Sequence, residues 1–231
     1  MTHRNLVAAR FAPLLVGAAD TEAADHLLIR HGQSEWNRDG RWQGQANPPL
    51  TELGAQQAAA VVACLPPVVR IVSSDLERAH RTAEIIHKLV DKSQSLPQLE
   101  LHKDLRERDA GPWSGLTKAE IELSWPGMLK AGERPPGFET DDHFRQRILS
   151  ALSDVLLDQP PTLVVAHGGL ISNLEAWSNR RGRGTLDNLG GVYLSSHLTL
   201  EAEKAQVKRP RIAVGRRFRC RAVPSTHAAI T

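Results

Sequence analysis

Apolar and polar positions along the chain predict strands that alternate with helices. Short apolar runs predict buried strands at 27–29, 68–72 and 162–166, with weaker strand signals near 99–102 and 191–194. Apolar residues at helical spacing predict helices over about 51–64, 76–90, 117–124, 139–158 and 170–178. This alternation indicates an α/β fold with a mostly parallel sheet and helices on both faces. We therefore expect functional residues at the carboxyl ends of the strands.

Three of these strand ends are followed by a cation or an imidazole. Arg30 and His31 follow the first strand, Arg78 lies in the first turn of the helix after the second, and His167 joins the strand at 162–166 to a helix. The planar fork of Arg matches phosphate, and a neutral imidazole beside it can act as a nucleophile. Any one of these residues alone would be interpreted as a surface or hydrogen-bonded structural residue. Their recurrence at three strand ends favours a single oxyanion site.

Longer motifs contain these residues, and together they resemble a known family. They are RHGQSEWN from Arg30, RWQGQ…PLTELGAQQA from Arg41 to Ala58, SSDLERAxRTAE from Ser73, LRERDxGxWSGLT from Leu105, and VAHGG from Val165. In this order they resemble the histidine phosphatase superfamily, in its phosphoglycerate-mutase-like branch, over roughly 26–188. The resemblance implies a three-layer α/β/α sandwich with a mostly parallel central sheet. It also implies a reaction through a phosphohistidine, with no metal and no cofactor.

The resemblance assigns a role to each matching residue. His31 would be the phosphorylated nucleophile, and Glu107 would protonate the leaving oxygen and later activate water. The phosphoryl group or the substrate would be bound by Arg30, Asn37, Gln43, Gly44, Arg78, His167 and Gly168. Asp104 and Asp109 lie in the same loop as Glu107, and only the motif distinguishes Glu107 from them. Guanidinium groups that offset the charge of the phosphoryl group would act as a divalent metal does elsewhere.

Phosphatases and mutases of this family share the chemistry and differ in what accepts the phosphoryl group. Only 59 residues separate Glu107 from His167, which resembles the compact phosphatases rather than the mutases with their long insertion. Arg108 favours the opposite interpretation, because the mutases also have an Arg after the catalytic Glu. We expect a phosphomonoesterase that acts on small phosphate esters. A phosphoglycerate mutase and a non-catalytic phosphate-binding protein are the alternatives.

Charge is distributed unevenly along the 231 residues. The whole chain has a net charge of +3, yet the segment from Arg180 onward holds 11 Lys/Arg and 3 Asp/Glu, a net of +8, and the preceding part has a net of −5. A mildly acidic body does not suit a general polyanion-binding surface. A nucleic-acid-binding tail would interleave aromatic residues with Arg, but 209–221 contains only Phe218. We expect a small-molecule partner, without nucleic acid or membrane.

The same patterns predict three segments. These are an N-terminal extension at 1–22 that is flexible, a histidine phosphatase domain at 23–195, and a basic tail at 196–231 of low order. Phe11 to Ala19 loosely resembles the apolar core of a signal peptide, an alternative for the extension.

Cys64 and Cys220 are too few for a disulfide framework, so a reducing compartment, the cytoplasm, is expected. No apolar run is long enough to cross a membrane. The oligomeric state stays open, with a homodimer as one option.

Overall fold

The computed structural model describes residues 14–17, 26–91, 96, 98–157, 159, 161–178, 186–200 and 208–224. Strands, helices and short 3-10 turns follow one another in an α/β order. The strands are β1 (Leu14–Gly17), β2 (His26–Arg30), β3 (Arg70–Ser73), β4 (Glu100–Leu101), β5 (Thr162–Ala166), β6 (Gly191–Leu200) and β7 (Lys208–Phe218). The helices are α1 (Glu35–Arg38), α2 (Glu52–Val61), α3 (Glu77–Val90), α4 (Lys118–Ser124), α5 (Met128–Ala131), α6 (Asp141–Leu156) and α7 (Gly168–Trp177). The 3-10 turns are η1 (Val62–Cys64), η2 (Lys103–Leu105) and η3 (Gly111–Trp113).

The described strands form one seven-stranded sheet in the order β1-β7-β6-β2-β5-β3-β4. Strands β2, β5, β3 and β4 run parallel to one another, whereas β6 is antiparallel to both β2 and β7. The mostly parallel sheet confirms the expected fold class. Because β2, β3 and β5 are neighbours and parallel, the loops that follow them emerge at the same edge.

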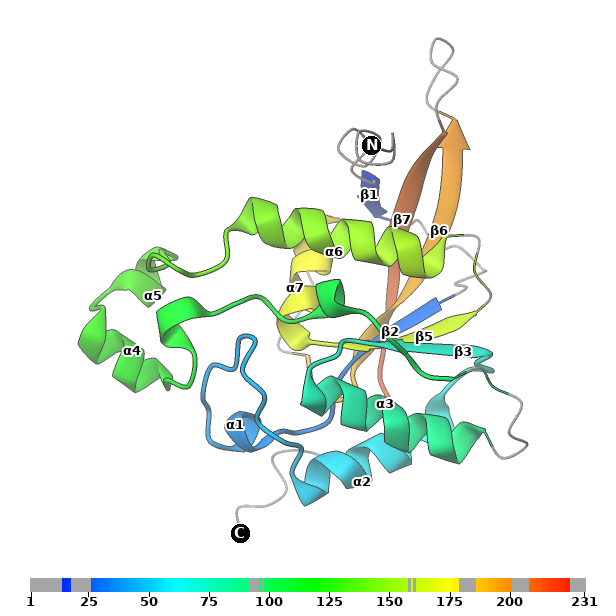
Figure 1. Ribbon diagram of the computed structural model, residues 1–231, viewed down its shortest axis with the longest axis horizontal. Helices are drawn as coiled ribbons and strands as arrows, with labels where there is room; N and C mark the ends of the chain where they lie inside the picture. Colours follow the sequence, from blue (N-terminus) through cyan, green and yellow to red (C-terminus); the bar gives the residue numbers. More distant parts are fainter. Residues whose placement is uncertain are drawn as a thin grey trace, which may run out of the picture.

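Helices cover both faces of this sheet and make three layers (Figure 1). Successive side chains of a strand point to opposite faces, so Leu27 and Ile29 of β2 pack in the hydrophobic cluster with α3, while Leu28 packs in the cluster with α6 and α7. Strand β5 alternates in the same way, and all five of its residues are buried. Burial on both faces explains why these strands appear in the sequence as continuous apolar runs.

A smaller unit, formed by α4, α5 and the turn η3, lies beside the main layers (Figure 1). Its core contains Ala110, Trp113 and Ile121, and Trp42 and Phe138 pack against it. Trp113 is fully buried, with its ring 5.2 Å from that of Trp42 and 5.6 Å from that of Phe138. This aromatic cluster forms a rigid wall next to the loops at the carboxyl edge of the sheet.

Both ends of the chain depart from the sequence prediction. Residues 14–17, within the expected flexible extension, form β1, which pairs with β7. Residues 208–218, within the expected tail of low order, form β7, in which Ile212 and Val214 are fully buried. Arg217 forms an ion pair with Glu175 of α7 at 2.7 Å, so part of the basic charge ties β7 to the fold. The remainder of 1–22 and of 196–231 outside the ranges given above is not described.

The two cysteines also differ from expectation, because Cys64 and Cys220 form a disulfide across 156 residues. It joins the end of η1 to the segment after β7. The cysteines therefore no longer support a reducing compartment, and the location in the cytoplasm stays a prediction. In the described part of the chain, no helix combines the length and apolar character needed to cross a bilayer.

Candidate active site

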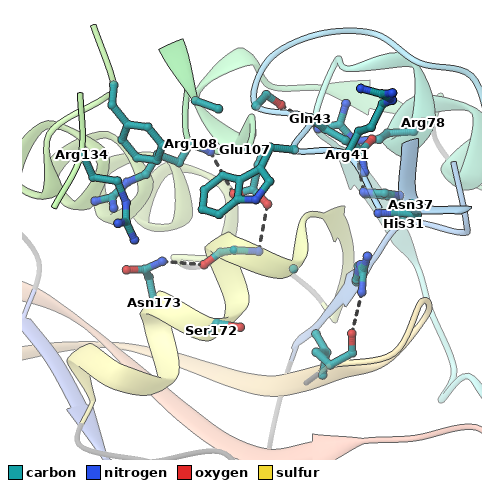
Figure 2. Close-up of a pocket in the computed structure, with 18 residues that line it drawn as sticks. His31, Asn37, Arg41, Gln43, Arg78, Glu107, Arg108, Arg134, Ser172 and Asn173 are labelled. Carbon is teal, nitrogen blue, oxygen red and sulfur yellow. Dashed lines mark hydrogen bonds between the residues drawn. The ribbon is translucent and has the colours of Figure 1, made fainter. Parts of the chain in front are cut away.

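The loops after β2, β3 and β5 meet around a pocket of about 440 Å³. Eight of the nine predicted site residues line it, namely Arg30, His31, Asn37, Gln43, Gly44, Arg78, Glu107 and Gly168 (Figure 2). The ninth, His167, is not among the lining residues. It is fully buried, with its ring centroid 5.2 Å from that of His31. Segments that are far apart in sequence thus converge as the strand topology predicts.

His31 lies at the end of β2 with its ring buried and its orientation fixed. Its Nδ1 is 2.6 Å from the carbonyl oxygen of Gly32, which can only accept, so Nδ1 carries the hydrogen and the lone pair is on Nε2. Nε2 accepts a hydrogen bond from Nε of Arg78 at 3.1 Å. Burial, and then the charges of Arg78 and Arg30, lower the pKa of His31 well below 6.5. The imidazole is therefore neutral at neutral pH, the form that a nucleophile needs.

Arg78 lies at the start of α3 and is held from three sides. Besides its hydrogen bond to His31, it donates to the carbonyl oxygens of Ala46 at 2.7 Å and Gly44 at 2.9 Å. Burial lowers the pKa of Arg78 to about 10, partly offset by the negative charge of Glu107, so its guanidinium stays charged at neutral pH. A fixed cation beside Nε2 of His31 suits a phosphoryl oxygen.

Arg30 supplies the second cation next to His31. Its Nη1 donates to the carbonyl oxygen of Leu186 at 2.6 Å, while its Nε is buried and has no hydrogen-bond partner among the described residues. Burial lowers the pKa of Arg30, and the charges of Glu107 and Asp187 oppose that effect. A buried N–H without a protein partner suits a polar ligand or an ordered water in the pocket that Arg30 lines.

His167 immediately precedes α7 and is held in the neutral form. Its Nε2 lies 2.9 Å from Oγ of Ser74, the residue that follows β3, and its Nδ1 has no partner in the described part of the chain. Burial, followed by the charge of Arg78, lowers its pKa well below 6.5. The contact of Ser74 with His167 is a connection that sequence reasoning missed.

Glu107 reaches the pocket from the loop after η2. Its two carboxylate oxygens accept from the backbone N–H groups of Arg108 and Gly169, each at 2.9 Å. A Cβ at Gly169 would lie 2.5 Å from Oε1 of Glu107, so a side chain at this position would displace the carboxylate. Asp104 and Asp109 line a different pocket, on the outer side of the loop. The structure thus separates Glu107 from the two carboxylates that sequence spacing alone could not exclude.

The segment between β2 and α2, which includes α1, supplies further polar groups to the pocket. Oδ1 of Asn37 accepts from the backbone of Ser34 at 3.2 Å, and Oε1 of Gln43 accepts from the Ser34 hydroxyl at 2.8 Å, so both side-chain amide nitrogens stay available to the pocket. Gly44 has φ +51°, and a Cβ there would lie 2.7 Å from the backbone nitrogen of Ala110. This tight turn aims the Gly44 carbonyl at Arg78.

Ten further residues line the pocket in addition to the predicted ones. They are Arg41, Trp42, Arg108, Ala110, Arg134, Phe138, Gly169, Ser172, Asn173 and Leu186. Arg108 follows Glu107 directly, whereas Arg134 has no motif signal and is found only from the fold. Among the described residues, no three His, Cys, Asp or Glu side chains group as a metal ion would require.

The profile of the histidine phosphatase superfamily (branch 1) matches residues 26–210. The chain belongs to this superfamily. It is 33% identical to glucosyl-3-phosphoglycerate phosphatase from Mycobacterium tuberculosis over 195 residues, covering 74% of this chain and 85% of the relative. It is 32% identical to a metal-independent phosphoserine phosphatase from Arabidopsis thaliana, covering 66% and 67%, and 36% identical to a probable phosphoglycerate mutase from Salmonella choleraesuis, covering 67% and 77%.

A solved structure of mycobacterial glucosyl-3-phosphoglycerate phosphatase in complex with VO3 matches the fold with a TM-score of 0.63 at 32% identity. The match covers 82% of this chain and 96% of that one. The comparisons thus confirm both the family and the three-layer fold class, and the chain is an enzyme of the histidine phosphatase type.

Proposed function

We propose that this histidine phosphatase hydrolyses small phosphate monoesters through a phosphohistidine at Nε2 of His31. The observation that carries the proposal is the neutral, buried imidazole of His31, which presents Nε2 to a pocket that also contains Arg30, Arg78 and the carboxylate of Glu107. A nucleophile, cations for a phosphoryl group and an acid/base lie within one cavity. The names of two relatives, both phosphatases, support the same activity.

In the first step, the lone pair of Nε2 attacks phosphorus while the phosphorus–oxygen bond of the ester breaks. Arg30 and Arg78 bind the phosphoryl oxygens and offset their charge, and Glu107 in its protonated form gives its proton to the leaving oxygen. The negative charge of a bound phosphate favours the protonated carboxyl group that this role needs. The alcohol leaves, and His31 carries the phosphoryl group.

In the second step, Glu107, now a carboxylate, takes a proton from water as the water oxygen attacks phosphorus. The nitrogen–phosphorus bond breaks, inorganic phosphate leaves, and His31 returns to its neutral form with Glu107 protonated. Over the cycle, Glu107 recovers from water the proton that it gave to the leaving oxygen. The proposed reaction uses only side chains of the protein and water, and therefore needs no cofactor. We propose that His167, held by Ser74, orients the phosphoryl group through Nδ1.

Phosphoglycerate mutase activity is the second candidate, because Arg108 lines the pocket and one relative is a probable mutase. In a mutase, the phosphoryl group on His31 passes to a bound phosphoglycerate instead of water. Incubation with 3-phosphoglycerate separates the two activities. Release of inorganic phosphate supports the phosphatase, whereas conversion to 2-phosphoglycerate without release identifies a mutase.

Turnover of an aryl phosphate in the presence of a chelator tests the mechanism. We expect the wild type to release phosphate and, when quenched during turnover, to carry an acid-labile phosphoryl group. His31→Ala should do neither, and Glu107→Gln should accumulate the phosphoenzyme with slow release. A requirement for divalent metal, or activity that survives His31→Ala, contradicts the proposal.

A further inference from the structure

The peptide group between His31 and Gly32 is held at both ends by side chains that have no part in the reaction steps above. Its carbonyl, that of His31, accepts a hydrogen bond from Nδ2 of Asn188 at 2.9 Å. Its N–H, that of Gly32, donates to Oγ1 of Thr82 at 3.0 Å. Asn188 and Thr82 are both buried. A longer bond of 3.4 Å joins the same Nδ2 of Asn188 to Oδ1 of Asn37.

The direction of the next carbonyl, that of Gly32, depends on this peptide group. The Gly32 carbonyl lies 2.6 Å from Nδ1 of His31 and keeps the hydrogen on that nitrogen. Glycine has no side chain to restrict its backbone, so its carbonyl is fixed only if the groups on both sides are held. On the far side, the N–H of Gln33 donates to Oε1 of Gln57 at 2.9 Å. On the near side, the two bonds described above do the same.

The hydroxyl of Thr82 connects this peptide group to the helix that carries Arg78. Thr82 belongs to the motif that begins at Ser73, and it lies one turn after Arg78 in α3. Its Oγ1 donates to the carbonyl of Arg78 at 2.6 Å, which leaves its lone pairs for the N–H of Gly32. Buried hydrogen bonds thus relate the backbone of the nucleophile to the cation beside it.

Asn188 lies in a turn at 186–190 that is bound to the end of β2. The carbonyl of Leu186 accepts from Nη1 of Arg30 at 2.6 Å, and the N–H of Leu189 donates to the carbonyl of Arg30 at 3.1 Å. Leu189 has φ +58°, and in the described part of the chain it is the one residue other than glycine with a positive φ. A leucine in this conformation is strained and persists only where its surroundings hold it. The strained turn places the amide of Asn188 against the carbonyl of His31.

We propose that Asn188 and Thr82 are positioning residues, which hold the His31–Gly32 peptide group so that Nε2 of His31 points at the incoming phosphorus. The inference rests on the proposed function, because it takes His31 as the nucleophile. Neither Asn188 nor Thr82 is among the residues that line the catalytic pocket, so both act through the backbone. Once Nε2 carries the phosphoryl group, the ring is positively charged, and its Nδ1–H donates more strongly to the Gly32 carbonyl.

Two single variants and their combination test the inference. Asn188→Ala removes the donor to the His31 carbonyl, and Thr82→Val removes the acceptor of the Gly32 N–H with little change in size. We expect each to slow formation of the phosphoenzyme from an aryl phosphate, measured by rapid quench, about tenfold. The inhibition constant of inorganic phosphate should change less than about threefold, because Arg30 and Arg78 still bind it. Since both variants loosen one peptide group, the loss in the double variant should be smaller than the product of the single losses.

Proton NMR of the resting enzyme gives a readout that does not depend on turnover. The hydrogen on Nδ1 of His31 lies in a bond of 2.6 Å to a backbone carbonyl, so it should give a downfield resonance that His31→Ala lacks. We expect this resonance to shift or broaden in Asn188→Ala and in Thr82→Val. An effect on stability alone would leave it in place.

Ser178→Ala is the matched control. The buried hydroxyl of Ser178 donates to the carbonyl of Glu175 at 3.0 Å at the end of α7, outside the pocket, so this variant loses a buried bond to the backbone elsewhere. It should keep both the rate of phosphoenzyme formation and the resonance. Thermal melting verifies that each variant folds. If Asn188→Ala does not fold, Asn188→Asp replaces it, because aspartate has the same size and as a carboxylate cannot donate.

The outcomes separate this inference from the proposed function. Folded variants at Asn188 and Thr82 that form the phosphoenzyme at the wild-type rate overturn the inference and leave the proposed function intact. Losses no larger than that of Ser178→Ala overturn it as well. A wild type that forms no phosphoenzyme overturns the proposed function itself.

Discussion

Arg147 of α6 donates from Nη2 to the backbone carbonyl of Glu107 at 2.9 Å. The same guanidinium donates from Nη1 to the carbonyls of Asp104 and Arg106, each at 2.8 Å, and pairs with Glu139 through two bonds of 2.7 Å. One largely buried side chain thus bonds three backbone carbonyls of the loop that carries the candidate acid/base. Arg147 is a positioning residue, because it acts through the backbone of Glu107.

Replacement of Arg147 by Lys should lower kcat more than it raises KM. Lysine keeps the charge beside Glu139 but cannot bond three carbonyls at once, so Glu107 loses its fixed position while the phosphate-binding arginines keep theirs. We expect kcat for an aryl phosphate to fall about tenfold or more. Arg145→Lys, on the same helix with its guanidinium over Trp177, is the control. Equal losses in both variants would indicate a general effect of α6.

Stability should decline as the pH falls below 6.5. Burial keeps the pKa values of His31 and His167 well below 6.5 in the folded protein, while the unfolded chain binds a proton at each near that pH. The unfolded state therefore binds more protons, and the free energy of unfolding falls by up to about 1.4 kcal/mol per pH unit for each histidine. Stability from this source is complete above 6.5 and is lost progressively below it.

Urea unfolding between about pH 7.5 and pH 5.5 measures this slope. His167→Asn removes one of the two buried imidazoles, so its stability should depend on pH about half as steeply in this range. The carboxylates with lowered pKa, such as Asp75 beside Arg106, affect stability at lower pH. A flat profile for the wild type from neutral pH to about pH 5.5 would contradict the buried, neutral state of the two histidines.

Local sequence patterns predicted the parts of the site that lie next to strand ends. The apolar run at 162–166 matches β5 in full, and once β2, β3 and β5 are parallel neighbours, the positions of Arg30, His31 and His167 follow from the topology. Thr51 and Thr117 cap their helices with side-chain hydrogen bonds, which explains why the starts of these two helices were predicted within one residue.

Features set by distant contacts could not be predicted from the sequence in the same way. Arg134 reaches the pocket because it packs on Trp42, Trp113 and Phe138, and no local pattern records that packing. In β7, Ile212, Ala213 and Val214 form a short buried run, but the basic residues on either side hid this signal.

Gly169→Ala should impair the reaction while the fold is kept. A methyl group at this position would lie 2.5 Å from Oε1 of Glu107, so the carboxylate has to move and its hydrogen bond from the Gly169 N–H is lost. We expect kcat for an aryl phosphate to fall by about tenfold to a hundredfold, the range of a misplaced acid/base. Gly132→Ala lies outside the site, where φ is +75° and no atom lies within 4 Å of an added Cβ; it strains the backbone and is the control for a loss of activity through lower stability.

The disulfide secures the segment after β7 to the layer that carries the His31 loop. Cys64 ends η1, and Cys220 packs in the hydrophobic cluster that includes Leu27 and Ile29 of β2. Beyond Cys220, the carbonyl of Pro224 accepts from Nε2 of Gln57, and Oε1 of Gln57 accepts from the backbone of Gln33, at 2.9 Å in each case.

Reduction of this disulfide should therefore lower stability more than activity. A link across 156 residues restricts the unfolded chain strongly, and its loss should cost about 2–5 kcal/mol. The direct supports of His31, from Gly32 and Arg78, do not involve it. We expect dithiothreitol to lower the urea midpoint of the wild type to that of Cys64→Ser/Cys220→Ser, whose own midpoint should not respond to the reductant. A wild type that dithiothreitol leaves unchanged, with both thiols shown to be reduced, would mean that β6, β7 and the Gln57 contacts hold this segment without the covalent link.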